Sequence, residues 1–320
     1  MKKTFKTVLC FLLASLFIIS AVGCSSGGSS TEVKTGTTSS YAYLLDTSNL
    51  NKPTLDLSNP TGQLKTVLDS GVLRIATSPD YPPAEFVTAD GTVYGSEMML
   101  AKYVADCLGV DLKIETMDFS GTFVAVDTGK VDLGISGYGW KADRAESYEL
   151  TTGYIGNDED EGNNYHTLIC AAGNETKYNS LESLVGAHII AQASSLQQMY
   201  VEDQIIALDP NAGTELEMVA TLDQAILALA SGKCDAVALD GTTAAQYVKE
   251  SDGAFAETGI KFDTAMYGDR EGNVMCAKKG ETAFVEVLNQ IIDCAMENGY
   301  YKQFYDQARE QAVGVEGAEE

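Results

Sequence analysis

Short apolar runs alternate with amphipathic segments along most of the chain. The run VLRIAT at residues 72–77 predicts a buried strand, and residues 97–108 repeat apolar side chains at helical spacing behind Ser96, the predicted cap. Asp90-Gly91, between β-rich residues, predicts a hairpin. Further strands are predicted at 111–117, 131–136, 188–193, 215–221, 233–240, 260–268 and 273–280, and further helices at 123–130, 180–185, 194–205, 222–232, 241–251, 281–299 and 300–310. Such alternation predicts parallel sheets with helices on their faces.

The alternation starts again after about residue 165, and a short motif repeats with it. GKVDL at residues 129–133 is echoed by GKCDA at residues 232–236, and each motif follows a predicted helix and enters an apolar strand. The repeat predicts two lobes of similar build. Ligands of open α/β sheets bind beyond the carboxyl ends of the strands. Those ends lie here near residues 75–81, 136–140, 191–195 and 240. A cleft between the lobes is therefore the predicted binding site.

The stretch ISGYGWKADR at residues 135–144 places two glycines, a serine and an arginine at one such strand end. The guanidinium of Arg144 suits a carboxylate bidentately, and Gly137 and Gly139 leave their backbone N–H groups approachable. With the Ser136 hydroxyl, this set favours a small carboxylate as ligand. The alternative is an ordinary surface turn in which Arg144 pairs with a neighbouring acid.

The other strand ends offer polar and aromatic groups. Ser194 and Ser195 begin a predicted helix, where free N–H groups suit an anion and where serines also serve as ordinary caps. Asp240 precedes another helix, so it could meet an ammonium group or simply cap that helix. Tyr81 and Phe119 follow strands and could form the apolar walls of a slot or belong to the core.

The composition is that of a globular protein with a strong acidic excess. The 320 residues carry a formal net charge of −25 at pH 7, which opposes binding to nucleic acid and to anionic membrane surfaces. The length allows one large or two ordinary domains. We therefore expect no nucleic-acid partner.

Residues 1–23 have the features of a signal peptide, in which lysines precede an apolar run that is short for a membrane span. The run ends in AVGC, which resembles the lipobox of bacterial lipoproteins, where the cysteine is acylated. We therefore expect Cys24 to carry a lipid such as palmitate and residues 24–61 to form a flexible tether to the membrane. Secretion with an unmodified Cys24 is the alternative.

The sequence contains no recognisable catalytic or metal-binding motif. The remaining cysteines downstream are isolated, and no CxxC pair or Cys/His cluster indicates zinc. They are Cys107, Cys170, Cys234, Cys276 and Cys294, predicted to be small buried apolar residues, with one disulfide left open. The acidic run at 157–162 lacks the spacing of an EF-hand loop. We predict no metal, no cofactor and no catalytic residue.

Six motifs follow one another in order between residues 64 and 305. They are GVLRIATSPDYPPAEF, DGTVYGSEMMLAKYVADCLG, GKVDLGISGYGWKADR, SLVGAHIIAQASSLQQ, GKCDAVALD and ENGYYKQFYDQ. Together they resemble the bacterial family 3 solute-binding proteins, the receptors of polar amino-acid ABC importers. The resemblance covers most of the chain that would follow the signal peptide.

The resemblance implies an α/β fold of the type II periplasmic-binding-protein kind. Two lobes, each a mostly parallel sheet flanked by helices, would be joined by two crossover strands. Lobe 1 would comprise residues 62–168 and 273–312, lobe 2 residues 169–272, the crossings residues 165–172 and 273–278, and a frayed tail residues 313–320.

The resemblance also implies roles for the candidate residues. Arg144 would bind an α-carboxylate and Asp240 an α-ammonium. The other implied ligand-binding residues are Ser136, Gly137, Gly139 and Ser195 around the carboxylate, and Tyr81 and Phe119 as aromatic walls. The family commonly has hydroxyl residues where Gly137 and Gly139 stand. The ligand would draw the lobes together, and the protein would deliver it to an ABC permease.

Side-chain specificity is predicted from departures from the family pattern. The candidate specificity residues are Ser78, Glu85, Tyr138, Trp140, Lys141 and Gln192. Ser78 stands where cationic-ligand binders often carry an acid, whereas Lys141 would favour an acidic side chain. We predict a neutral polar amino acid. Tyr138 and Trp140 either line the side-chain end of the pocket or pack beneath it.

The predicted protein is a monomeric, extracytoplasmic binding lipoprotein that is held on the cell membrane only through Cys24. Two other functions fit the same fold. One is a dehydratase of prephenate-like acids, for which Glu85 is the nearest candidate acid. The other is a sensory lipoprotein that retains the cleft.

Overall fold

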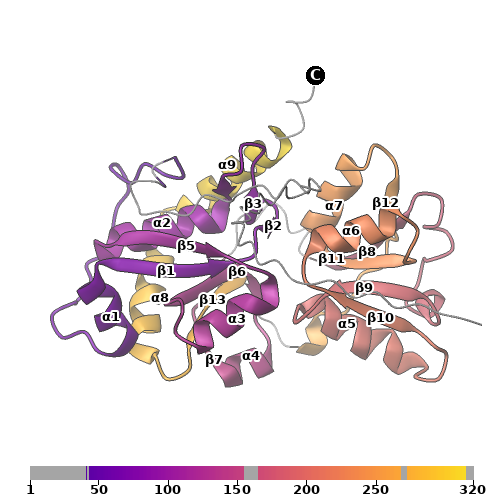
Figure 1. Ribbon diagram of the computed structural model, residues 1–320, viewed down its shortest axis with the longest axis horizontal. Coiled ribbons are helices and arrows are strands. Elements are labelled where there is room, and N and C mark those ends of the chain that lie inside the picture. The colour runs from indigo at the N-terminus through magenta and orange to yellow at the C-terminus, as the bar shows by residue number, and fades with distance from the viewer. Residues whose placement is uncertain (1–40, 42, 155–164, 268–271, 315–320) are drawn as a thin grey trace, which may run out of the picture. The chain divides into compact units, whose positions relative to one another are not determined.

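The computed structural model describes residue 41 and residues 43–154, 165–267 and 272–314. In these residues the strands form two five-stranded sheets and one small three-stranded sheet (Figure 1). The predicted signal peptide, Cys24 and the acidic run at 157–162 lie outside the described residues. Within the described residues, no helix has both the length and the hydrophobicity that crossing a membrane requires.

The first sheet has the strand order β5-β1-β6-β13-β7. Its strands are β1 (Val72–Thr77), β5 (Asp111–Thr116), β6 (Leu133–Gly139), β7 (Tyr148–Leu150) and β13 (Asn273–Lys278). β1 is parallel to β5 and β6, whereas β13 is antiparallel to β6 and β7.

Helices cover both faces of the first sheet. They are α1 (Gly62–Ser70), α2 (Ser96–Leu108), α3 (Phe119–Asp127), α4 (Ala142–Ser147), α8 (Thr282–Glu297) and α9 (Tyr300–Gly314). Apolar side chains of α1, α2, α8 and α9 share one core cluster with β1 and β5. Those of α3 pack against Ala76 in a separate cluster.

The second sheet has the order β10-β9-β11-β8-β12. Its strands are β8 (His166–Ala171), β9 (His188–Gln192), β10 (Glu215–Val219), β11 (Ala236–Asp240) and β12 (Phe255–Glu257). β9 is parallel to β10 and β11, and β8 is antiparallel to β11 and β12. Helix α5 (Leu196–Gln204) covers one face, and α6 (Leu222–Ala230) and α7 (Gly241–Glu250) cover the other (Figure 1). The predicted two-lobed α/β fold is confirmed.

The small sheet extends the carboxyl end of β1 with a predicted hairpin. Its strands are β2 (Asp80–Tyr81), β3 (Glu85–Val87) and β4 (Val93–Tyr94), paired antiparallel. The turn that joins β3 to β4 contains Asp90 and Gly91, as the sequence predicts, and Gly91 has a positive φ of 80°.

The sequence echo marks equivalent positions in the two sheets. Asp132 donates its backbone N–H to the carbonyl of Arg74 at 2.8 Å, and its Oδ2 accepts the Arg74 N–H at 2.8 Å. Asp235 forms the same reciprocal pair with His188, at 2.8 and 2.9 Å. In each lobe, an aspartate before the central strand therefore fixes the register of the neighbouring strand.

Within the segment predicted to be a tether, residues 24–61, the apolar residues near Tyr41 pack against the first lobe. Tyr41 and Leu44 are 1% and 0% exposed and belong to the core of the first lobe. Tyr43 donates its hydroxyl to the carbonyl of Val93 at 2.8 Å. The polar composition of this segment concealed apolar residues that cover helices of the lobe.

Three local predictions are corrected. The predicted strand at 260–268 is absent from its described part, residues 260–267, because β12 takes the edge position beside β8 and the residues after it follow an irregular path that buries Ile260 and Phe262. Ser96 is the first residue of α2, and Gly95, with φ of 138°, is the cap. Residues 180–185 contain only a 3₁₀ turn, Glu182–Leu184.

The predicted boundary between residues 168 and 169 falls inside β8. That strand pairs along its length with β11 and β12, so it belongs whole to the second lobe. The other domain boundaries stay predictions.

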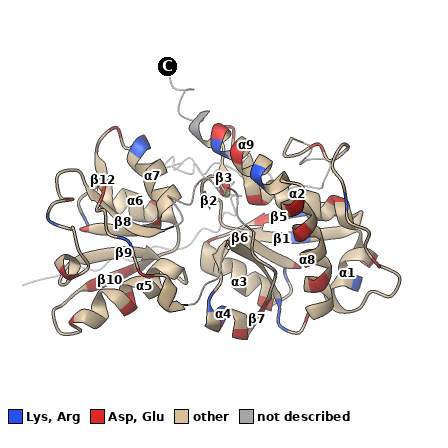
Figure 2. Ribbon diagram, turned by 180° about the vertical axis from the view of Figure 1, so that it is seen from behind, with Lys and Arg blue, Asp and Glu red and all other residues tan. Residues whose placement is uncertain are grey.

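Figure 2 shows Asp and Glu on helices of both lobes. Several basic residues pair with acids one helical turn away, as Lys302 does with Asp306 at 2.7 Å. Exposed pairs of this kind contribute little to stability. The acidic residues are therefore spread over the surface, and the fold is stabilised mainly by apolar packing.

Leu44→Ala should lower the free energy of unfolding by about 2–5 kcal/mol, because it leaves a cavity in a fully buried position. Urea denaturation of the purified protein measures the change. The control is Asn49→Ala in the same segment, where the side chain is exposed. Equal stability of the two variants would show that the segment is a detached tether.

Candidate functional site

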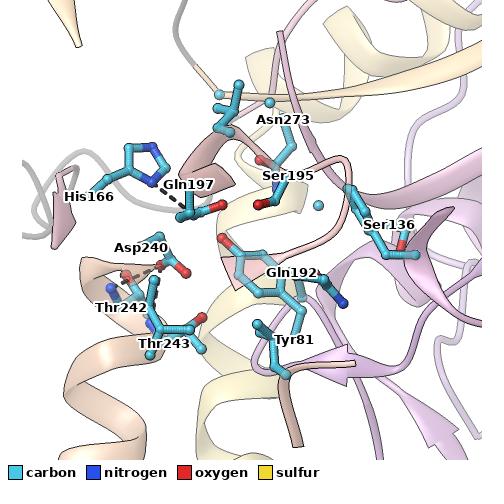
Figure 3. Close-up of a pocket in the computed structure, with 18 of the residues that line it drawn as sticks. Tyr81, Ser136, His166, Gln192, Ser195, Gln197, Asp240, Thr242, Thr243 and Asn273 are labelled. Atoms are coloured by element: carbon cyan, nitrogen blue, oxygen red, sulfur yellow. Dashed lines mark hydrogen bonds between the residues drawn. The ribbon is translucent and has the colours of Figure 1, made fainter. Parts of the chain in front are cut away.

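A cleft of about 580 Å³ lies at the carboxyl ends of the strands and takes residues from both lobes. All eight predicted ligand-binding residues line it: Tyr81, Phe119, Ser136, Gly137, Gly139, Arg144, Ser195 and Asp240. In Figure 3 the ring of Tyr81 lies between Asp240 on one side and Ser136 on the other. The structure therefore brings together side chains that are up to 159 residues apart in the sequence, from Tyr81 to Asp240.

Arg144 is a buried cation that has no acidic partner among the described residues. It lies in the first turn of α4, which follows β6, and it is 4% exposed. Its guanidinium carbon lies 4.9 Å from the ring centroid of Phe123 and 5.5 Å from that of Tyr138. These distances are typical of cation–π contacts. Burial lowers the pKa of this guanidinium.

The hydrogen bonds of Arg144 go to backbone carbonyls of both lobes. Nη1 donates to Gly139, and Nη2 donates to Ser194 of the second lobe at 3.0 Å. Among the described residues, no carboxylate lies within salt-bridge distance of this side chain. The predicted alternative, a surface turn with an acid-paired arginine, is wrong. A buried cation that meets only carbonyl dipoles remains strongly attractive to an anion.

The predicted role of the two glycines is corrected. The N–H of Gly137 donates to Oε2 of Glu97 at 2.8 Å, so it is not a donor that a ligand could use. Gly137 has φ of 58°, and a Cβ there would lie 2.7 Å from the Tyr81 ring. A Cβ on Gly139 would lie 2.3 Å from Cδ1 of Leu196 in the second lobe. Gly137 needs glycine because of its positive φ and the Tyr81 ring, whereas a side chain at Gly139 would require Leu196 to move.

Asp240 caps α7 with one oxygen and leaves the other unused. Oδ1 accepts the N–H groups of Thr242 and Thr243 at 3.0 and 3.1 Å. Oδ2 is buried and accepts no hydrogen bond from the described residues, and the same holds for Oγ1 of Thr243. Burial raises the pKa of the nearby Tyr81 hydroxyl well above its ordinary value, and the Asp240 carboxylate raises it further. Asp240 can therefore cap α7 with one oxygen and accept a hydrogen bond from a ligand cation with the other.

The start of α5 faces the same cleft. Ser195 accepts the N–H of Gln198 at 3.1 Å, which makes it the N-cap that the alternative prediction describes. Gln197, in the first turn, is hydrogen-bonded to Nδ1 of His166 at 2.9 Å (Figure 3). Burial lowers the pKa of His166, so the ring is kept neutral.

Two glutamates share the floor of the cleft. Glu85 and Glu97 are 1% and 0% exposed, and Glu85 lines the cleft. Glu97 accepts hydrogen bonds from Gly137 N, from Tyr154 OH at 3.0 Å and from Asn273 Nδ2 at 3.0 Å. Burial raises the pKa of both carboxyls, and the neighbouring Glu97 raises that of Glu85 further. Of the two carboxyls, Glu85 therefore has the stronger tendency to retain a proton.

The candidate specificity residues divide into two groups. Glu85, Trp140 and Gln192 line the cleft, whereas Ser78, Tyr138 and Lys141 do not. Tyr138 is fully buried and donates its hydroxyl to Thr122 Oγ1 at 2.5 Å, so it packs beneath the cleft. Lys141 pairs with Asp143 at 3.1 Å.

Sequence reasoning missed several functional positions. They are Glu97, His166, Gln197 and Asn273, which line the cleft or contact its lining. A carboxylate in the apolar first turn of α2 was the available signal for Glu97. His166 pairs in register with Asp240, a relation that sequence spacing does not reveal. In the part of the chain described, no group of acidic, histidine or cysteine side chains is arranged to hold a metal, and Cys107, Cys170, Cys234, Cys276 and Cys294 are unbridged.

The fold and the cleft define a two-lobed solute-binding protein of the type II periplasmic architecture. The sequence profile of the bacterial extracellular solute-binding proteins, family 3, matches residues 73–160 of the chain. The matched segment runs from β1 past Arg144.

Relatives and solved structures agree with this family. The arginine-binding protein ArgT of Corynebacterium glutamicum is 26% identical over 199 residues, which cover 62% of this chain and 63% of that protein. The L-cystine-binding protein TcyJ of Escherichia coli K12 is 22% identical over 74% of this chain and 82% of its own length. An amino acid ABC transporter substrate-binding protein from Streptococcus pneumoniae, solved with L-arginine, has a TM-score of 0.68 and 27% identity, covering 78% of this chain and 98% of its own.

Glu85→Gln should make the protein more stable relative to wild type as the pH rises. The folded state holds the Glu85 proton because its pKa is raised, while the unfolded state loses that proton above the ordinary value of 4.5. The free energy of unfolding of the wild type therefore falls, relative to that of Glu85→Gln, by up to about 1.4 kcal/mol per pH unit. Urea denaturation between about pH 5 and pH 8 measures it. Glu286→Gln, at an exposed position of α8, should show no such trend. A pH-independent difference for Glu85→Gln would contradict a protonated Glu85.

Proposed function

We propose that this protein captures a free amino acid in the cleft by closure of the two lobes and delivers it, as a monomer, to an ABC permease. The observation that carries the proposal is that two charged side chains in the cleft each lack a partner of opposite charge in the part of the chain that the structure describes. Among the described residues, Arg144 is a buried cation with no carboxylate within salt-bridge distance, and Asp240 has a buried oxygen that accepts no hydrogen bond. An α-amino acid supplies both missing groups on neighbouring atoms.

The two partners sit on different lobes. Arg144 follows β6 of the first lobe, and Asp240 ends β11 of the second. Each charge-assisted hydrogen bond contributes about 1.5–3 kcal/mol. A ligand held by both residues binds the closed arrangement better than the open one, so it shifts the population toward closure. The amino-acid names of the relatives support this general role.

The contacts at the side-chain end favour a neutral polar ligand. A cationic side chain would need a carboxylate, and burial with the neighbouring Glu97 raises the pKa of Glu85, which disfavours its charged form. Asp80 already accepts hydrogen bonds from Ser78, Gln192 and Leu222. Neutral Glu85 and Ser136 can exchange hydrogen bonds with an amide or a hydroxyl. Arginine, which ArgT and the Streptococcus protein bind by name, is the main competing ligand.

Arg144→Ala and Asp240→Asn should each weaken amino-acid binding by about 100-fold. A thermal-shift screen of the twenty amino acids first identifies the ligand, because a ligand of the folded state raises its stability. Calorimetry then measures the affinity of each variant. Asp240→Asn keeps an oxygen for the α7 cap and removes only the charge.

Arg74→Ala is the matched control, because Arg74 pairs with Asp132 outside the cleft lining. It should lower stability and leave the affinity unchanged. Full-strength binding by both cleft variants would rule out the site assignment. Tight binding of arginine, with no thermal shift from glutamine or serine, would contradict the predicted neutral ligand and leave the predicted site intact.

We also infer that Cys24 anchors the protein to the extracytoplasmic side of the cell membrane, on the strength of the AVGC motif. In cells fed a palmitate analogue, the wild type should become labelled and Cys24→Ser should not. Release of the variant into the medium is the accompanying readout. Equal labelling of both proteins would refute the anchor.

A dehydratase function remains the second candidate because Glu85 is a protonated carboxyl in the cleft. Such a group can give its proton to a leaving hydroxyl. Steady turnover of prephenate by the wild type, lost in Glu85→Gln, would support catalysis. Thermal stabilisation without turnover would support binding alone.

A further inference from the structure

Asp80 links the two lobes through its side chain. It lies on β2 of the first lobe and is 8% exposed. Oδ2 accepts the backbone N–H of Leu222 at 2.7 Å and the side-chain amide of Gln192 at 3.0 Å, both from the second lobe. Oδ1 accepts the hydroxyl of Ser78 at 2.8 Å from its own lobe. Both oxygens are therefore engaged, and two of three donors come from across the cleft.

The contact with Leu222 completes the N-terminus of α6. That helix begins at Leu222, and its N-cap residue, Thr221, makes no side-chain cap hydrogen bond. Three other helices take their caps from the residue just before them: α3 from Asp118, α5 from Ser195 and α7 from Asp240. A carboxylate at a helix N-terminus is stabilised by the unsatisfied N–H groups and by the helix dipole. Helix α6 receives this stabilisation from the other lobe.

We propose that Asp80 is a latch that controls how readily the lobes close, because it supplies the missing cap of α6 only when the lobes are in contact. The latch does not touch the groups assigned to the α-carboxylate and α-ammonium. It therefore adds to closure whatever amino acid the cleft holds. The inference deepens the proposed function, since it names the residue that sets the balance between open and closed forms.

The charged surroundings give the latch a pH dependence. The titratable groups that face Asp80 are Asp223 on α6, Glu85 on β3, and Tyr247 and Glu250 on α7. Burial raises the pKa of Asp80 from 3.8 to about 6 and Asp223 adds to the rise, which together outweigh the lowering by the hydrogen bonds from Leu222 and Ser78. The protonated side chain keeps an oxygen that can accept from Leu222, and it avoids the cost of burying a charge. When the lobes separate, water returns to Asp80 and its pKa falls back. The closed form therefore binds the proton more tightly, and acidification from about pH 7 to pH 5 favours closure by about tenfold.

The test uses purified protein freed of bound solutes, so that it does not depend on any ligand. Asp80→Ala should increase the radius of gyration in small-angle scattering and speed hydrogen exchange of the Leu222 amide by about tenfold or more. Asp80→Asn keeps an oxygen that can accept from Leu222, so it should stay close to wild type at neutral pH. Asp209→Asn is the control, because its carboxylate accepts a backbone N–H within the second lobe at 3.0 Å and does not line the cleft.

A pH series separates the latch from a merely structural role. The wild type should become more compact between about pH 7 and pH 5, and Asp80→Asn should lose that response. Unchanged scattering and unchanged Leu222 exchange in Asp80→Ala would overturn the latch. So would an equal pH response of wild type and Asp80→Asn. Neither result bears on amino-acid capture, which fails only if the screen finds no ligand.

Discussion

The structure of the cleft depends on one buried guanidinium. Placing an unpaired cation out of water is costly, and Arg144 is tolerated because backbone carbonyls and aromatic faces replace part of its hydration. The aromatic residues Phe119, Phe123 and Tyr138 hold it from one lobe, and the Ser194 carbonyl holds it from the other. A site built in this way keeps its affinity for an anion because no acid neutralises it.

The two sheets explain why such partners face one another. Each sheet has three parallel strands, then one strand that runs in the opposite direction (β13 or β8), then an edge strand that again runs with the first three. Each sheet also has the same aspartate contact at the start of its central strand. The carboxyl ends of both sheets therefore lead into the cleft. Arg144 and Asp240 occupy comparable places after the central strands β6 and β11. Two sheets of the same topology therefore place a cation and a carboxylate in the same cleft.

Much of the fold and the cleft could be predicted from local pattern. Alternation of strands and helices identified both sheets, and residues at strand ends were recognised because parallel strands gather their ends. The prediction failed where a distant segment decides the outcome. Gly137 is fixed by Tyr81 and Glu97, and Gly139 by Leu196. Tyr41 was assigned to a tether because nothing nearby in sequence indicates the helices that it covers.

The contact between Gly139 and Leu196 has a consequence for changing this protein's specificity. A side chain placed at Gly139 would meet the side chain of Leu196 of the opposite lobe. The two positions form a matched pair, in which one lobe gives up volume to the other. A hydroxyl residue introduced at Gly139 would therefore displace Leu196 as well as add a hydrogen-bonding group, so exchanging both residues together would separate the two effects.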